Sequence, residues 1–129
     1  RSLRSHISTY SESLIYEAYG GLQNDGIMLA VYYDVDAAKI IHQLDSWEKI
    51  NDSPTISSIL KNVSSYFGLD FVIPEIASGN FFLYDNSQHK ELRSEAEMNT
   101  LLLHSEDVNF SLVVWDDEKH TIYIVEYRI

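Results

Sequence analysis

The apolar side chains of residues 55–67 fall on one face when this segment forms a helix. A single helix cannot bury that face without a second surface to pack against. The apolar side chains recur at spacings of three and four residues, which is the period of one helix face. They are Ile56, Ile59, Leu60, Val63 and Phe67. Between them lie mostly serine, lysine and asparagine. The chain must therefore supply a second apolar surface on which this helix packs.

Signals at both ends support the same helix. Ser53 can cap its first turn, and Pro54 occupies the first helical position, where a missing N–H costs nothing. Gly68 follows the last apolar position and is expected to end the helix.

Short runs of β-branched, aromatic and alternating apolar residues predict the strands that this helix needs. We predict a hairpin formed by residues 27–33 and 39–44 and interrupted at 34–37, then strands at 81–84, 91–92, 108–115 and 121–129. The last strand is expected to run antiparallel to the one before it. It pairs either with its own sheet or with another copy of the chain.

Two capping boxes predict two further helices. Thr9 and Glu12 precede an apolar stripe in residues 10–19, which Gly20 follows as a stop signal. Ser94 and Glu97 form the second box and open a short helix over the residues that follow.

Composition limits the function classes. The 129 residues fit one domain, 1–129, and carry 9 basic and 20 acidic residues, a net charge of −11. That charge argues against binding nucleic acid or anionic membranes. The absence of cysteine excludes disulfides and thiol catalysis.

No apolar run reaches the roughly 20 residues that a membrane helix needs, and no signal peptide opens the chain, so we expect a cytoplasmic protein. The opening residues do not look like an initiator sequence, and we expect a module of a larger protein.

The element order over residues 27–115 resembles a ubiquitin-like β-grasp, and within it residues 55–115 resemble the Ras-association type. The stretches that carry the resemblance are TISSILKNVSSYFGLD, FFLYDNSQHKEL, SEAEMNTLLL and FSLVVW. The resemblance implies an α+β fold with a mixed or antiparallel sheet packed on one main helix, 55–67. The helix 10–19 and the strand 121–129 would be additions to that fold.

One departure from the resembled family concerns charge. Ras-association domains that bind Ras present basic residues on their first two strands. Here residues 27–44 hold only Lys39, against Asp34 and Asp36. The charge on these residues therefore does not complement the acidic surface of a GTPase such as Ras.

No catalytic motif occurs in the chain. The five histidines lack metal-ligand spacing, no glycine-rich phosphate loop is present, and no serine lies in a nucleophile motif. Asp34 and Asp36 could hold a divalent cation, but a solvated turn is the favoured interpretation. We therefore expect no enzyme, no cofactor and no metal, although an enzyme built from scattered carboxylates or histidines stays an open alternative.

Seven residues are the candidate contacts to a partner. Acidic groups steer a basic partner, and tryptophan is frequent among residues that dominate binding energy. The candidates are Asp34, Asp36, Asp85, Glu91, Trp115, Asp116 and Asp117. The competing interpretation of residues 116–118 is a solvated hairpin turn whose neighbouring aromatics belong to the core.

Two functions are consistent with these features. The first is a non-catalytic protein–protein interaction domain of a signalling or scaffold protein, which binds through a strand edge or an acidic face. The second is a small acidic inhibitor or immunity protein that blocks the basic active site of a nuclease or toxin. In both cases the partner is a protein, and the oligomeric state stays open.

Overall fold

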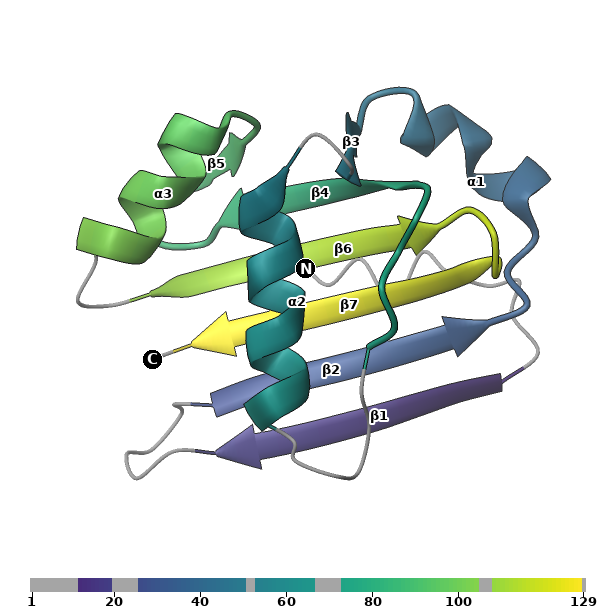
Figure 1. Cartoon of the computed structure of the whole chain (residues 1–129), viewed down its shortest axis with the longest axis horizontal. Coiled ribbons are helices and arrows are strands. Elements are labelled where there is room, and N and C mark those ends of the chain that lie inside the picture. Colours follow the sequence, from purple (N-terminus) through teal and green to yellow (C-terminus); the bar gives the residue numbers. More distant parts are fainter. Residues whose placement is uncertain (1–11, 20–25, 51–52, 67–72, 105–107, 129) are drawn as a thin grey trace.

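One antiparallel sheet forms the centre of the molecule. The computed structural model describes residues 12–19, 26–50, 53–66, 73–104 and 108–128. The strands are β1 (Glu12–Tyr19), β2 (Gly26–Tyr33), β3 (Glu48–Lys49), β4 (Gly79–Asp85), β5 (Lys90–Leu92), β6 (Asn109–Asp116) and β7 (Thr121–Arg128). They follow the order β1-β2-β7-β6-β4-β3, and β5 also pairs with β4 (Figure 1). All strand pairs among the described residues are antiparallel.

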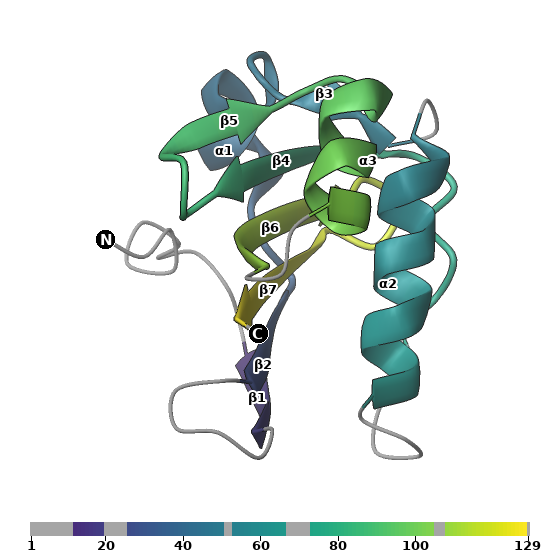
Figure 2. The same ribbon diagram turned by 90° about the vertical axis from the view of Figure 1, so that its left-hand side faces the viewer.

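In the described part of the chain, three helices lie on the two faces of this sheet. They are α1 (Ala37–Leu44), α2 (Pro54–Tyr66) and α3 (Glu95–His104). Figure 2 shows α2 and α3 on one side of the sheet and α1 on the other. The sheet is therefore the middle layer of three.

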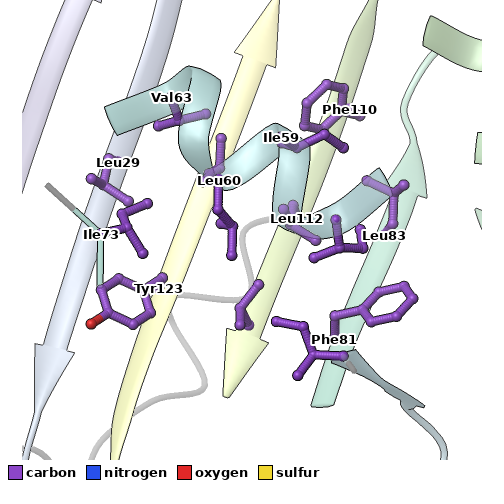
Figure 3. Close-up of a cluster of buried hydrophobic side chains, with 14 of the residues drawn as sticks. Leu29, Ile59, Leu60, Val63, Ile73, Phe81, Leu83, Phe110, Leu112 and Tyr123 are labelled. Carbon is purple, nitrogen blue, oxygen red and sulfur yellow. The ribbon is translucent and has the colours of Figure 1, made fainter. Parts of the chain in front are cut away.

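The larger core lies between the sheet and α2, as the sequence predicts. Ile59, Leu60 and Val63 of α2 contact inward side chains of four strands, including Leu29 and Leu112, which are fully buried (Figure 3). Burial of this kind contributes about 1.5–3 kcal/mol for each large aliphatic side chain. The apolar face of α2 is thus buried against the sheet.

The second face of the sheet carries a smaller core under α1. Val35 and Ile40 pack there against Trp115, Ile122 and other side chains of the same face. The helix α1 has only 8 residues, so it covers one end of this face, at the right of Figure 1.

Both predicted helix starts inside the described residues are confirmed. The Ser53 hydroxyl accepts a hydrogen bond from the Ile56 N–H at the start of α2. Ser94 and Glu97 form the reciprocal capping box of α3, in which each side chain accepts from the other residue's backbone N–H. The predicted end of the longer helix at Gly68 lies outside the described residues.

Several strands are also confirmed. The strands β4, β5, β6 and β7 occupy the predicted segments 81–84, 91–92, 108–115 and 121–129 within one or two residues. The last strand pairs with its own sheet, between β2 and β6. It is therefore a central strand of the sheet and not an addition at its margin.

The prediction of a helix over residues 10–19 is wrong. Residues 12–19 form β1, which pairs with β2 along its whole length, from Glu12 opposite Tyr33 to Tyr19 opposite Gly26. This segment contains isoleucine and tyrosines that favour strands as well as an apolar stripe that fits a helix. Pairing with β2 favours the strand over the helix, and the sequence of residues 12–19 alone does not contain this information.

The prediction of a strand over residues 39–44 is also wrong. These residues belong to α1, whose first turn is capped by the Asp36 carboxylate through the Ala38 N–H, at 3.1 Å. The segment that follows Asp36 is rich in alanine and other good helix formers. The N-cap signal at Asp36 would have identified the helix, since aspartate is a preferred N-cap residue.

We predict that Leu60→Ala destabilises the fold strongly. The Leu60 side chain is only 6% exposed and lies between α2 and the sheet (Figure 3). Its truncation leaves a cavity and should lower the free energy of unfolding by about 2–5 kcal/mol. Urea denaturation followed by circular dichroism measures this. The adjacent, exposed Lys61→Ala is the matched control and should change stability by less than about 0.5 kcal/mol. Equal effects of the two substitutions would contradict the packing described.

The capping box of α3 predicts a pH dependence of stability. Backbone N–H groups of Ser94 and Arg93 donate to the Glu97 carboxylate and hold its pKa below the ordinary value of 4.5. A lowered folded-state pKa adds stability that is present above the unfolded pKa and is lost as pH falls through the folded pKa. The stability difference between wild type and Glu97→Gln should therefore shrink between about pH 5 and pH 3.

Denaturation at each pH gives this difference, with Glu75→Gln as the control. Glu75 is exposed and accepts no hydrogen bond within the described residues. A Glu97→Gln difference that stays constant over this pH range would contradict the role of the carboxylate.

Candidate functional site

Two hairpin turns of this sheet are built in the same way. In the β4–β5 turn the Asp85 carboxylate accepts from the N–H groups of Ser87 and Gln88, at 2.9 and 3.2 Å. In the β6–β7 turn the Asp116 carboxylate accepts from the second and third following N–H groups, at 3.0 and 3.2 Å. Both aspartates are buried, with exposed fractions of 2% and 1%. These two candidate contacts are therefore occupied in shaping turns.

Each of these turns ends on a histidine in the left-handed conformation. The φ angles of His89 and His120 are 56° and 49°. A left-handed residue at the end of a short loop is common in hairpins and lets the second strand re-enter the sheet. The Asp-x-x-x-His pattern shared by the two turns is the sequence signal of this geometry.

One end of the sheet gathers acidic residues from two distant segments. The loop 34–36 follows β2 and meets the turn 117–120, where the Val35 N–H donates to the His120 carbonyl at 2.9 Å. This contact brings Asp34 and Asp36 to the same end of the sheet as Asp117 and its neighbour Glu118 (Figure 1). All four are exposed. We call these two segments, 34–36 and 116–120, the acidic end.

Basic residues are few at the acidic end. Lys119 lies in the turn itself, and Lys39 follows in the first turn of α1. Asp36 also serves as the N-cap of α1, so its carboxylate has a structural role in addition to its charge. The four exposed carboxylates therefore outnumber the two neighbouring cations.

Trp115 does not present its ring to solvent. It is fully buried in the core under α1, and its ring lies 5.6 Å from that of His120. Its indole N–H donates to the Asp117 carboxylate at 3.2 Å. The residue thus orients one carboxylate of the acidic end and does not itself offer contact area to a partner.

The structure places the candidates Asp85 and Glu91 at the opposite end of the sheet. The register sets Gly79 opposite Asp116, whereas Asp85 lies opposite Phe110. Glu91 is 2.9 Å from the guanidinium of Arg93, which also binds Glu48 at 3.0 Å. Hydrogen bonds to Glu91 and Glu48 raise the pKa of Arg93.

Arg93 thereby links the two short strands β3 and β5. It also donates to the Ser46 carbonyl at 3.0 Å, just before β3. Because β3 and β5 both pair with β4, this link protects one edge of the sheet from further pairing. Glu91 therefore belongs to an ion pair with Arg93 that covers this edge of the sheet.

Sequence reasoning missed a groove at that same end, on the face that α1 covers only in part. Its volume is about 550 Å³. Phe82 and Tyr84 of β4 line it, together with Val113 of β6 and Ile124 of β7. The register sets Phe82, Val113 and Ile124 side by side across three strands.

The groove also carries polar side chains. Asn86 donates to the Asn109 side-chain carbonyl at 3.0 Å and to the Ser111 hydroxyl at 3.1 Å. Glu126 and Arg128 of β7 complete the lining. The sequence signal was the polar alternation in the first half of β6, where asparagine and serine alternate with buried residues.

No group of histidines, aspartates and glutamates that would hold a metal ion occurs in the described part of the chain. None of the described helices has the length and apolar character needed to cross a membrane.

No protein-family model, curated protein or solved structure matches this chain.

The left-handed turn residue predicts a stabilising substitution. A non-glycine residue in this conformation costs about 1–2 kcal/mol relative to glycine. We expect His89→Gly to raise the free energy of unfolding by roughly 1 kcal/mol, as measured by urea denaturation. Ser87→Gly in the same turn is the control, since Ser87 has no positive φ, and it should lower stability by a few tenths of a kcal/mol. Destabilisation by His89→Gly would show that the imidazole contributes more than the strain costs.

Proposed function

We propose that this chain is a non-catalytic protein–protein interaction domain whose acidic end binds a partner with a basic surface. The observation that carries the proposal is the hydrogen bond from Val35 to His120, which unites two acidic segments far apart in the sequence. Exposed carboxylates of one sign, held at one end of a rigid sheet, steer an oppositely charged partner and orient its approach.

Hydrogen bonds that hold two of the carboxylates at the acidic end support this proposal. Asp36 is held by the first turn of α1, and Asp117 is held by the Trp115 indole. Side chains that are already ordered lose less conformational entropy when a partner binds. The net charge of −11 extends the attraction for basic partners beyond direct contacts.

An acidic inhibitor of a basic nuclease or toxin is the second candidate function. The same four exposed carboxylates favour it, because they offer a surface that competes with phosphates for a basic site. The two candidates differ in the identity of the partner and not in the surface that binds it.

A Ras-association or ubiquitin-like form of the module is the narrower version of the proposal. The segment α2-β4-β5-α3-β6 follows the element order that the resemblance requires. Two features differ from that order, since residues 39–44 form a helix and β7 lies in the middle of the sheet. We therefore base the proposal on the acidic end and not on the resemblance.

The test is capture of partners from native lysate by wild type and by Asp34→Lys/Asp117→Lys. Proteins bound through the acidic end should be retained by wild type at low salt, lost as salt rises, and bound about tenfold more weakly by the double variant. Mass spectrometry identifies the retained proteins, and titration calorimetry measures their affinity. A nuclease or toxin among them supports the inhibitor, and a signalling or scaffold component supports the module.

Glu126→Lys is the control for a change of charge, because Glu126 lies at the opposite end of the sheet. It should bind the same proteins as wild type. Equal capture by wild type and the double variant would reject the acidic end as the binding surface. Turnover of a defined substrate by the purified protein, tested with and without divalent metal, would reject the non-catalytic function.

A further inference from the structure

We propose that the groove at the opposite end of the sheet binds a neutral, polyhydroxylated ring, such as a mono- or disaccharide. Its volume of about 550 Å³ lies within the range of roughly 300–1,000 Å³ that is usual for small-molecule sites. It is distinct from the acidic end, because its lining comes from β4, the β4–β5 turn, residues 109–113 of β6 and residues 124–128 of β7. The inference therefore does not depend on the proposed protein partner.

The groove has an apolar floor and an aromatic wall. Val113 and Ile124 are almost fully buried and adjacent in register. The rings of Phe82 and Tyr84 continue along β4, nearly parallel at 14°, with centroids 6.3 Å apart. Both are half-buried and keep accessible surface. A ring with one face of C–H groups would release water from this surface on binding.

Polar groups at the rim are held in place before any ligand binds. The Asn86 amide donates to both Asn109 and Ser111, and the Asn86 backbone N–H donates to the Asn109 carbonyl at 2.9 Å. Within the described part of the chain, the Asn86 side-chain carbonyl, the Asn109 amide and the Ser111 hydroxyl hydrogen have no hydrogen-bond partner, so a ligand can use them. Hydroxyl groups both donate and accept, so they can satisfy this mixture of donors and acceptors.

The charges of the rim favour a neutral occupant. Glu126 and Arg128 stand two residues apart on β7, on the same face of the sheet. Neither side chain has a hydrogen bond or ion pair among the residues that the structure describes. One carboxylate and one guanidinium give no net charge, whereas a phosphate site would present several cations. The acidic chain as a whole disfavours anions further.

The experiment is an NMR titration of the 15N-labelled chain. The probes are methyl glycosides of common hexoses and N-acetylhexosamines, with their disaccharides, up to about 10 mM, since single-site saccharide contacts of this size bind weakly. We expect at least one probe to shift resonances of residues 82–89, 109–113 and 124–128 with saturation. Adenosine monophosphate is the anionic comparison and should leave these resonances unchanged.

Two variants locate the site. Tyr84→Leu keeps an apolar side chain but removes the ring, and Glu126→Gln keeps the shape but removes the charge. Each should weaken the responding probe by about tenfold, whereas Gln43→Ala on the exposed face of α1 should not. A urea denaturation curve for each variant shows whether it is folded. If Tyr84→Leu does not fold, Glu126→Gln alone tests the site.

Three outcomes would overturn the inference. The first is that no saccharide shifts the groove resonances at the highest concentration. The second is that a saccharide binds but neither variant weakens it. The third is that adenosine monophosphate saturates the same resonances in preference to the saccharides.

Discussion

Strand β7 is buried on both of its faces, so the rest of the structure has to cover each face with apolar side chains. Residues 121–125 are buried without interruption. Ile122 and Ile124 face the core under α1, whereas Tyr123 and Val125 face the core under α2. Burial of Tyr123 also raises the pKa of its phenol. A central strand of this kind requires a cover on each side, so the sheet can only be the middle of three layers.

The two covers are unequal in length, and this inequality creates the groove. The 13 residues of α2 extend across several strands, and α3 lies beside it, where Glu95 accepts from the Thr55 N–H at 3.3 Å. The 8 residues of α1 cover only the end of the other face that holds Trp115. Beyond α1 the same face changes from apolar to mixed polar side chains, which is what an antiparallel sheet needs where it meets water.

Elements with a complete local signal could be predicted from the sequence. The helix α2 has its cap, its proline and its stripe within a few residues, and β6 shows its alternation directly. The predictions of a helix over residues 10–19 and of a strand over residues 39–44 are wrong because the apolar residues fit both periods. Strand pairing decides the first segment, and helix capping decides the second. Which strand is central is a property of the whole sheet, and no single segment contains that information.

The candidate site shows the same division. The sequence offers the acidic residues as candidate contacts, but it cannot separate exposed carboxylates from those that shape turns, nor show that Asp85 and Glu91 lie at the opposite end of the sheet. Asp116 and Asp117 are neighbours, yet the first is 1% exposed and accepts two backbone N–H groups, and the second is exposed. The groove was missed because its residues are individually ordinary and become a site only when the register aligns them across three strands.

The two ends of the sheet use one turn design for two kinds of surface. Each turn has a buried aspartate at its start and a left-handed histidine at its end, so the backbone is set in the same way in both. The residues between them differ, with Asp117 and Glu118 in one turn and Asn86 and Ser87 in the other. The acidic end carries four exposed carboxylates, whereas the charges of Glu126 and Arg128 in the groove cancel. Salt therefore weakens recognition at the acidic end more than it weakens contacts of a neutral ligand in the groove. The salt dependence of binding therefore distinguishes the two surfaces, and a ligand can bind at one without affecting the other.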